Sequence, residues 1–173
     1  SAIYASLAAR IFTPCTIVGV VGNDFPASFR KILQDRNIDL SGLETMPGDT
    51  FRWQGRYDYN LNSAQTEKTS LGVFEKFRPD NFKGFEKFPM VFLGNIDPEL
   101  QLSIIKKTAS SVPFIAVDTM NFWIEKSYEK LTEVIQNSDL VLMNEAEIRQ
   151  YTGDYNLIPA ARKILSLGPR FVI

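Results

Sequence analysis

Polar side chains of the kind that hold metal ions and polar ligands follow short apolar runs at three places in the sequence. They are Asn95, Asp118, Asn121, Asn144 and Glu147. If the apolar runs are parallel strands, these side chains lie at the carboxyl edge of a sheet, where such folds bind ligands. A carboxylate there can hold Mg²⁺ through water, because Mg²⁺ loses its hydration shell reluctantly. Glu147 is therefore a candidate for holding a metal ion through water, with Asn144 beside it. The other three are candidate substrate-binding residues.

Several of these candidates also have a purely structural interpretation. Asparagine is a good N-cap, and a glutamate three residues later completes a capping box, so Asn144 and Glu147 can simply begin a helix. Asn121 can cap the helix that follows it. Asp97 precedes Pro98 and is best interpreted as an N-cap with proline in the first helical position. Binding and capping are compatible, since a capped helix end still presents N–H groups.

Histidine is absent from the 173 residues. This absence excludes Ser-His-Asp and Cys-His nucleophiles and the usual zinc ligand sets. Carboxylates, amides, lysine, arginine, a metal ion and backbone N–H groups remain. That set suits phosphoryl transfer, where positioning and neutralisation of charge supply most of the catalysis.

The composition is that of an ordinary globular domain, with 45% hydrophobic and 23% charged residues. The net charge of -1 gives no electrostatic basis for binding nucleic acid or an anionic membrane. No apolar run is long enough to span a bilayer. The single cysteine, Cys15, cannot form an internal disulfide, which fits a reducing cytoplasm.

Short apolar runs alternate with helical stretches along most of the chain. The expected strands are Thr16–Gly22, Met90–Leu93, Pro113–Val117, Leu140–Met143 and Arg170–Ile173. The expected helices are Ser1–Arg10, Phe25–Arg36, Pro98–Lys107, Phe122–Gln136, Glu145–Tyr151 and Asn156–Leu167. Continuous apolar runs are typical of strands buried on both faces. The alternation predicts an α/β fold, with a mostly parallel sheet and helices on both of its faces.

Residues 43–74 break this rhythm. Thr50–Asn60 alternates between aromatic and polar side chains, the period of two of a half-exposed antiparallel strand. Thr66–Phe74 can supply its partner after a polar turn. The sequence therefore predicts a small β-sheet lid over residues 43–74 and an α/β body over residues 1–42 and 75–173.

The chain resembles the ribokinase (PfkB) family of carbohydrate kinases at four places, in the family's order. The matching segments are Ser1–Ala5, then Val20–Asp24 followed by Asn37–Leu40, then Asp118–Asn121, and finally Asn144–Glu147 followed by Tyr151–Gly153. The last of these matches the family's Asn-x-x-Glu motif, which is implicated in organising magnesium and phosphate. The resemblance therefore implies that Asn144 and Glu147 bind the nucleotide phosphates and that Glu147 is a magnesium ligand through water. The resemblance extends over essentially the whole chain.

This resemblance implies a ribokinase-like fold and a kinase that moves the γ-phosphoryl group of ATP, with Mg²⁺, onto a hydroxymethyl group of a sugar or nucleoside. It implies that Ser1 and Tyr4 approach the substrate, because they match the residues directly after the family's Gly-Gly turn. A place in the helix core is the alternative for Tyr4. Asp24 also matches the family, but an N-cap role for the helix after it explains this residue.

Four aromatic side chains of the expected lid share one face of its strand. They are Phe51, Trp53, Tyr57 and Tyr59. Trp53 is the candidate for stacking on a sugar-like substrate and excluding water from it. The alternative is that these rings bury against a second subunit, because an exposed apolar face of this kind needs covering. Lids in the resembling family often make dimer contacts, so a homodimer through the lid is also expected.

The family's Gly-x-Gly-Asp turn, whose aspartate is the catalytic base, does not occur in the sequence. We expect it downstream of Ile173, and the Gly-Gly turn before Ser1. The alternative to a kinase is a non-catalytic ligand-binding or structural protein of the same fold. Neither Gly-x-Gly-x-x-Gly nor the P-loop pattern occurs, so other nucleotide-binding folds are poorly supported.

Overall fold

The structure is a computed structural model of the chain and describes residues 2–57, 59, 64–108 and 111–173. Residue contacts divide the chain into two compact units, Ser1–Pro79 and Asp80–Ile173. Each unit combines parallel strands with helices, as the α/β prediction requires. None of the helices in the described residues has the length and apolar composition needed to cross a membrane.

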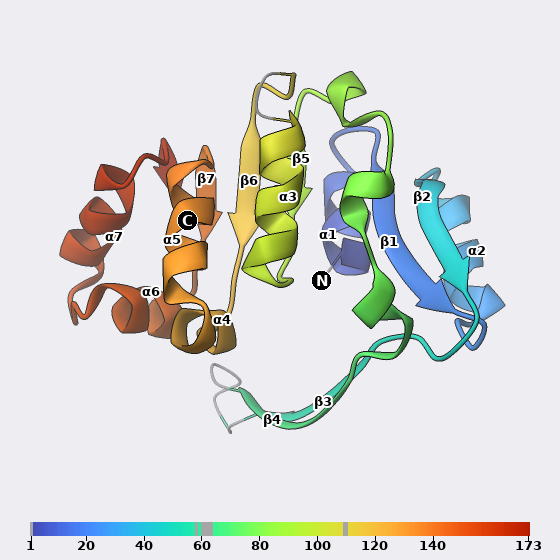
Figure 1. Ribbon diagram of the computed structural model, residues 1–173, viewed down its shortest axis with the longest axis horizontal. Helices are drawn as coiled ribbons and strands as arrows, with labels where there is room; N and C mark the ends of the chain where they lie inside the picture. The colour runs from blue at the N-terminus through green and yellow to red at the C-terminus, as the bar shows by residue number, and fades with distance from the viewer. Residues whose placement is uncertain (1, 58, 60–63, 109–110) are drawn as a thin grey trace. The chain divides into compact units, whose positions relative to one another are not determined.

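The first unit is built on two parallel strands, β1 and β2 (Figure 1). Its elements are α1 (Ala2–Ala9), β1 (Thr16–Gly22), α2 (Ala27–Asp35), β2 (Asp39–Met46), β3 (Arg52–Tyr57), β4 (Ala64–Ser70) and the 3₁₀ helix η1 (Gly72–Lys76). The bounds of β1 are those predicted from its apolar run. Ile17, Leu33 and Ile38 form a buried cluster that packs β1 against α2.

Strand β2 was not predicted from the sequence, because an irregularity in its pairing with β1 changes the spacing of its core-facing residues. The register shifts by one residue between Thr16 and Val18, so β2 holds one extra residue there. Such a bulge lets Leu40 and Leu43 contact the same core cluster although they are three positions apart. A spacing of three does not match the strand period of two, which hid this strand. Residues 43–46, expected in the lid, belong to this parallel strand.

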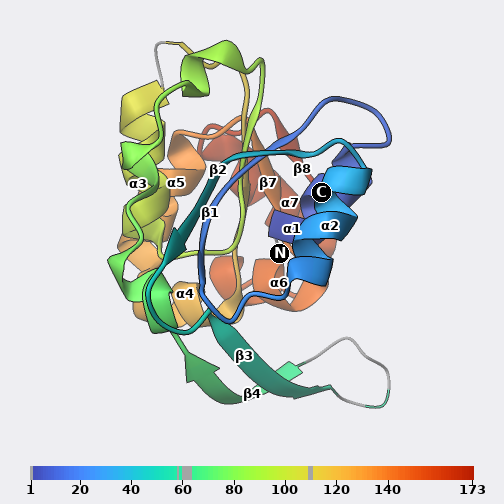
Figure 2. The ribbon, with the colours of Figure 1, turned by 90° about the vertical axis from the view of Figure 1, so that its right-hand side faces the viewer.

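Strands β3 and β4 form a separate antiparallel sheet, called the ribbon below. The predicted antiparallel pair is thus confirmed. Figure 2 shows the ribbon extending away from β1 and β2. Strand β4 ends at Ser70, because Gly72 begins η1. Within β4, Glu67 forms a bulge. The turn expected at residues 60–63 lies outside the described residues.

Two glycines allow a tight backbone crossing at the base of the ribbon. A Cβ atom on Gly22 would lie 2.1 Å from the carbonyl oxygen of Gly48, and one on Gly72 would lie 2.1 Å from that of Asp49. Gly72 also has a φ of 55°, in the left-handed region that favours glycine. The segment between β2 and β3 therefore passes where a side chain at either glycine would block it.

The second unit contains a four-stranded parallel sheet in the order β5-β6-β7-β8. The strands are β5 (Val91–Leu93), β6 (Ile115–Asp118), β7 (Leu140–Leu142) and β8 (Phe171–Val172). The helices are α3 (Pro98–Thr108), α4 (Asn121–Lys126), α5 (Tyr128–Gln136), α6 (Glu145–Thr152), α7 (Leu157–Ser166) and the 3₁₀ helix η3 (Phe85–Lys87), while η2 (Pro79–Asn81) spans the boundary between the units. Helices α3 and α5 pack side by side in front of the sheet in Figure 1. All four strands were predicted from the sequence.

One predicted helix, Phe122–Gln136, is divided into α4 and α5. Ser127 interrupts it with a φ of -142° and a ψ of 38°, outside the helical range. Ile124 and Leu131 are buried on either side of the break. The break lets each short helix bury its own apolar side chain. The apolar spacing in the sequence runs through both helices, so it did not indicate the break.

The crossing at the base of the ribbon predicts opposite outcomes for two glycines of the same strand. Replacing Gly22 by alanine should destabilise the protein by about 2 kcal/mol or more, because the new Cβ overlaps backbone atoms. Replacing Gly19 by alanine is the matched control, since its Cβ would meet only side chains, the nearest being that of Leu43 at 3.6 Å. Urea unfolding followed by circular dichroism measures both changes. Equal effects of the two substitutions would contradict the crossing.

Candidate functional site

The carboxyl ends of β5, β6 and β7 share one edge of the second unit's sheet. The strands are parallel neighbours, with Leu93 paired to Val117 and Asp118 paired to Leu142. Polar residues that end or follow these strands therefore lie along this edge, as the sequence predicted. They are Asn95, Asp118, Asn144 and Glu147.

Asn144 and Glu147 form a complete capping box at the start of α6. The Glu147 N–H donates to Asn144 Oδ1 at 3.0 Å, and the Asn144 N–H donates to Glu147 Oε2 at 2.9 Å. The capping interpretation is therefore confirmed. Glu147 is only 7% exposed. Burial raises the pKa of Glu147, and the negative charge of the neighbouring Asp118 raises it further. Hydrogen bonds with the backbone and side chain of Asn144 lower the pKa, but they offset only part of the increase.

Asp118 is a second partly buried carboxylate at this edge. Burial raises its pKa, while hydrogen bonds with the backbone of Thr119 and Asn95 lower it. The described residues contain no group of three or more acidic, histidine or cysteine side chains that could hold a metal ion by themselves. Mg²⁺ is usually held by one or two carboxylates together with phosphate oxygens and waters. This pair of carboxylates fits Mg²⁺ in that form.

Gln101 of α3 ties the ends of β5 and β6 together. It is 1% exposed, and its Nε2 donates to the carbonyl oxygens of Gly94 at 3.0 Å and Asp118 at 2.9 Å. A longer bond of 3.4 Å reaches the oxygen of Leu93. Sequence analysis missed this residue, although one signal was available. Gln101 is a polar side chain on the helical stripe that also contains Pro98 and Ile105, both buried.

Thr119 is the other residue of this edge that sequence analysis passed over. Its side chain is 5% exposed, and no hydrogen-bond partner for Oγ1 exists in the described part of the chain. A buried hydroxyl without a partner costs free energy. Such groups are rare in folded proteins and call for an explanation, such as a strained or ligand-dependent site.

Asn95 is held by an aromatic residue of α4. The indole Nε1–H of Trp123 donates to Asn95 Oδ1 at 2.9 Å. This bond fixes which end of the Asn95 amide is the acceptor, and it leaves Nδ2 as the end that can donate to a ligand. Phe122 packs edge-on against Trp123 with ring centroids 4.9 Å apart. No local pattern in the sequence indicated that Trp123 would support Asn95.

Asn121 does not cap α4, so the structural alternative considered for it is wrong. The N-cap position is Met120, and no side-chain bond caps this helix. The Asn121 amide instead donates to Gln150 of α6, and Gln150 donates to Glu125 at 3.0 Å. These bonds connect α4 with α6 and orient Asn121. Asp97, by contrast, does cap α3 as predicted, accepting from the Glu99 N–H at 2.9 Å.

Two of the remaining candidates lie in the first unit. Tyr4 of α1 is 81% exposed, so it is not the helix core residue of the alternative interpretation. Trp53 of β3 is 37% exposed and contacts the Tyr57 ring, with centroids 6.2 Å apart. Ser1 lies outside the described residues. The aromatic face predicted for β3 is therefore present at Trp53 and Tyr57.

The N-cap role expected for Asp24 is wrong. Helix α2 begins at Ala27 after Pro26, and its N-cap position makes no side-chain hydrogen bond. The Asp24 carboxylate accepts hydrogen bonds from Thr50 and Arg52, at the start of the ribbon. Asp24 was thus assigned to the wrong element, because its partners lie 26 and 28 residues along the chain.

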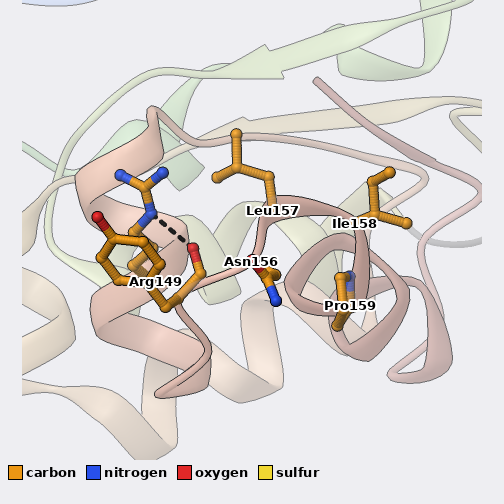
Figure 3. A pocket seen from close by; sticks show the side chains of 6 residues that line it. Arg149, Asn156, Leu157, Ile158 and Pro159 are labelled. Carbon is orange, nitrogen blue, oxygen red and sulfur yellow. Dashed lines mark hydrogen bonds between the residues drawn. The ribbon is translucent and has the colours of Figure 1, made fainter.

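A cavity of about 530 Å³ lies where α6 meets α7 (Figure 3). Arg149 lies at one side of it, donating to the carbonyl oxygen of Tyr155 at 2.9 Å and lying over the Tyr155 ring. Arg149 also pairs with Glu145 at 3.1 Å. None of the predicted site residues lines this cavity, and its arginine is already neutralised. The polar edge of the sheet is therefore the better candidate site. The cavity is lined by Arg149, Tyr155, Asn156, Leu157, Ile158 and Pro159.

Comparisons with known proteins point to one fold. No protein-family model matches the chain. A curated cytidine kinase from Thermococcus kodakarensis is 25% identical over 164 residues, which are 91% of this chain and 56% of that protein. The crystal structure of a Methanocaldococcus jannaschii nucleoside kinase, an archaeal member of the ribokinase family, matches 93% of this chain and 54% of its own, with a TM-score of 0.69 and 20% identity.

A third similar protein is a fructokinase double mutant from Vibrio cholerae, solved with fructose, ADP and a potassium ion. It matches 99% of this chain and 59% of its own, with a TM-score of 0.78 and 17% identity. The chain therefore has the ribokinase-like α/β fold with a small antiparallel sheet. The resemblance inferred from the sequence is confirmed at the level of the fold. The chain spans just over half the length of these relatives.

The bonds of Gln101 predict that the edge of the sheet depends on this one amide. Replacing Gln101 by methionine keeps the length of the side chain but removes its donors, leaving carbonyl oxygens unpaired. We expect a loss of about 2 kcal/mol in the free energy of unfolding. Replacing Ser103 by alanine is the control and should cost less, because its hydroxyl donates to the carbonyl oxygen of Leu100 in the same helix. Thermal unfolding measures both, and equal losses would contradict the role of Gln101.

Proposed function

We propose that the chain is part of an ATP-dependent kinase that phosphorylates a hydroxymethyl group of a sugar or nucleoside. The observation that carries this proposal is the edge of the second unit's sheet, where the capped N-terminus of α6 adjoins two partly buried carboxylates. Helix N-termini favour phosphate, and carboxylates favour a metal that accompanies it. The kinases with the same fold support the proposal by analogy.

In this proposal Asn144 and Glu147 lie beside the nucleotide phosphates, and Glu147 holds Mg²⁺ through water, with Asp118 nearby. Magnesium, when bound, neutralises the charge of the transferring phosphoryl group. The backbone N–H groups at the start of α6 orient the phosphoryl oxygens. The base that deprotonates the acceptor is proposed to be an aspartate outside these 173 residues. The proposed location is the cytoplasm, which supplies ATP and suits the single cysteine.

The acceptor is proposed to contact a set of side chains that includes amides, a carboxylate, hydroxyls and aromatic rings. These groups can bind sugar hydroxyls by hydrogen bonds and cover an apolar face of a sugar or base. The cytidine, nucleoside and fructose named for the similar proteins fall within this class. The proposed acceptor-binding residues are Ser1, Tyr4, Trp53, Asn95, Asp118 and Asn121.

Transfer of labelled phosphate from ATP to a panel of nucleosides and sugars tests the proposed function. In the intact protein, Glu147→Gln should lower magnesium-dependent turnover at least about tenfold, because the charge is lost. Stability should change little, since glutamine at this position still closes the capping box. Glu145→Gln is the control, because Glu145 lies in the same helical turn but is exposed and pairs with Arg149.

Two results of this assay decide against the proposal. If no acceptor in the panel is phosphorylated although ATP and the acceptors bind, the protein is a non-catalytic binding protein of the same fold. If Glu147→Gln lowers the midpoint of thermal unfolding but leaves the dependence on magnesium concentration unchanged, Glu147 only caps α6.

The exposed aromatic face of β3 predicts a role for Trp53 in covering the acceptor. In the intact protein, Trp53→Ala should raise the acceptor KM about tenfold, from the loss of stacking, and should increase ATP hydrolysis without acceptor. Gln54→Ala is the control, since Gln54 lies on the other face of β3 and bonds to Glu67. Subunit mass is measured in parallel. Altered mass with normal kinetics would assign Trp53 to a dimer contact, and no change in any measurement would remove both roles.

A further inference from the structure

One carboxylate joins the end of β1 to the start of the ribbon. Asp24 Oδ1 accepts from the Thr50 N–H at 2.7 Å and from the Thr50 hydroxyl at 2.6 Å. Asp24 Oδ2 accepts from Arg52 Nη2 at 2.6 Å. Asp24 follows the last residue of β1 by two positions, and Arg52 is the first residue of β3. All three bonds therefore act at the point where the ribbon begins.

The Thr50 hydroxyl extends these bonds back into β1. It accepts from the backbone N–H of Gly22 at 2.9 Å while donating to Asp24. The Thr50 hydroxyl therefore links two hydrogen bonds: its lone pair accepts from the backbone of β1, and its hydrogen is donated to the Asp24 carboxylate. Hydrogen bonds to an ionised acceptor are stronger than neutral ones. Thr50 is thus fixed by its backbone and its side chain together.

The backbone around Thr50 is confined as well. The N–H of Val73 donates to the carbonyl oxygen of Asp49 at 2.9 Å, which joins the segment that enters the ribbon to the helix that follows it. Gly22 and Gly72 leave no space beside this segment. Beyond Arg52 the side chains of β3 are mostly exposed. The direction in which the ribbon leaves the sheet is therefore set at its base.

We propose that Asp24 is a positioning residue that fixes the start and direction of the ribbon and so holds Trp53 where it meets the acceptor. The part of this inference that concerns the acceptor rests on the proposed kinase function. Side-chain bonds from Thr50 and Arg52 hold the pKa of Asp24 well below its usual range. A carboxylate with a depressed pKa stays charged at neutral pH and loses its stabilising bonds only in acid. The bonds that Asp24 accepts from Thr50 and Arg52, called the clamp below, therefore involve a charged carboxylate at neutral pH.

Hydrogen exchange of the chain tests the clamp without any need for activity. Asp24→Asn should accelerate exchange of the amides of β3 and β4 about tenfold or more, because charged hydrogen bonds are lost. Amides of β1 and β2 should change little. Asp39→Asn is the matched control, since Asp39 accepts comparable bonds from Ser41 and Thr16 at the opposite end of β1 and β2. Acceleration confined to the ribbon in Asp24→Asn alone supports the clamp.

A pair of substitutions at Thr50 makes the test independent of Asp24. Thr50→Val keeps the shape of the side chain but removes the hydroxyl, and it should accelerate exchange in the ribbon as Asp24→Asn does. Thr50→Ser keeps the hydroxyl and should behave as the unaltered protein. Unchanged exchange in the ribbon for both Asp24→Asn and Thr50→Val would overturn the clamp. Equal acceleration throughout the first unit would also overturn it, since that result indicates general destabilisation.

Kinetics of the intact protein test the positioning of Trp53. Asp24→Asn should raise the acceptor KM about tenfold, with the KM for ATP unchanged, and should increase ATP hydrolysis without acceptor. Arg56→Gln is the control, because it removes a cation of β3. Arg56 Nη2 pairs with Glu67 Oε1 at 3.2 Å, and both residues belong to the ribbon. Accelerated exchange with unaltered acceptor KM would overturn the positioning role. If the unaltered protein phosphorylates nothing, the proposed function fails, while the exchange result still decides on the clamp.

Discussion

Parallel pairing in register between β5, β6 and β7 is the constraint on which the candidate site depends. This pairing brings residues from three distant parts of the sequence to one edge of the sheet. The backbone hydrogen bonds of the strands place them there, and no contact between their side chains is required. A slip of one residue would turn each side chain of a strand to the opposite face. The buried amide of Gln101 resists such a slip between β5 and β6, since it bonds to carbonyl oxygens at the ends of both strands. The geometry of the site is therefore a consequence of the sheet.

The electrostatic state of this edge is set by the same packing. Asp118 and Glu147 are both removed in part from water, and the charge of Asp118 raises the cost of charging Glu147. Backbone N–H donors compensate this cost only in part. A divalent cation, or phosphate carried with one, would supply the missing compensation. The unpartnered hydroxyl of Thr119 lies next to Asp118 in the chain and is a second polar group whose bonding is incomplete within the described residues. Both features are typical of a site arranged for a ligand.

The sequence predicted best where one physical signal dominated. The run Thr16–Gly22 is apolar and β-branched, and it forms a strand with the predicted bounds. Strand β2 was hidden by a bulge that places Leu40 and Leu43 on one core. The polar supports were missed for another reason. The partners of Asp24 and Trp123 are more than 25 residues away in the chain, and local periodicity has no access to such pairs.

A polar residue at a strand end can take one of several roles, and three residues of this chain show this. The side chain of Glu147 closes a helix end while keeping a buried carboxyl group at the edge of the sheet. Asn121 could have capped α4 but bonds to Gln150 instead, so its place in the sequence did not determine its role. Asp24 resembles an N-cap in sequence and yet holds the start of the ribbon. A polar residue at a strand end has several backbone and side-chain donors within reach. The tertiary fold decides which of them it uses, and so whether it remains available to a ligand.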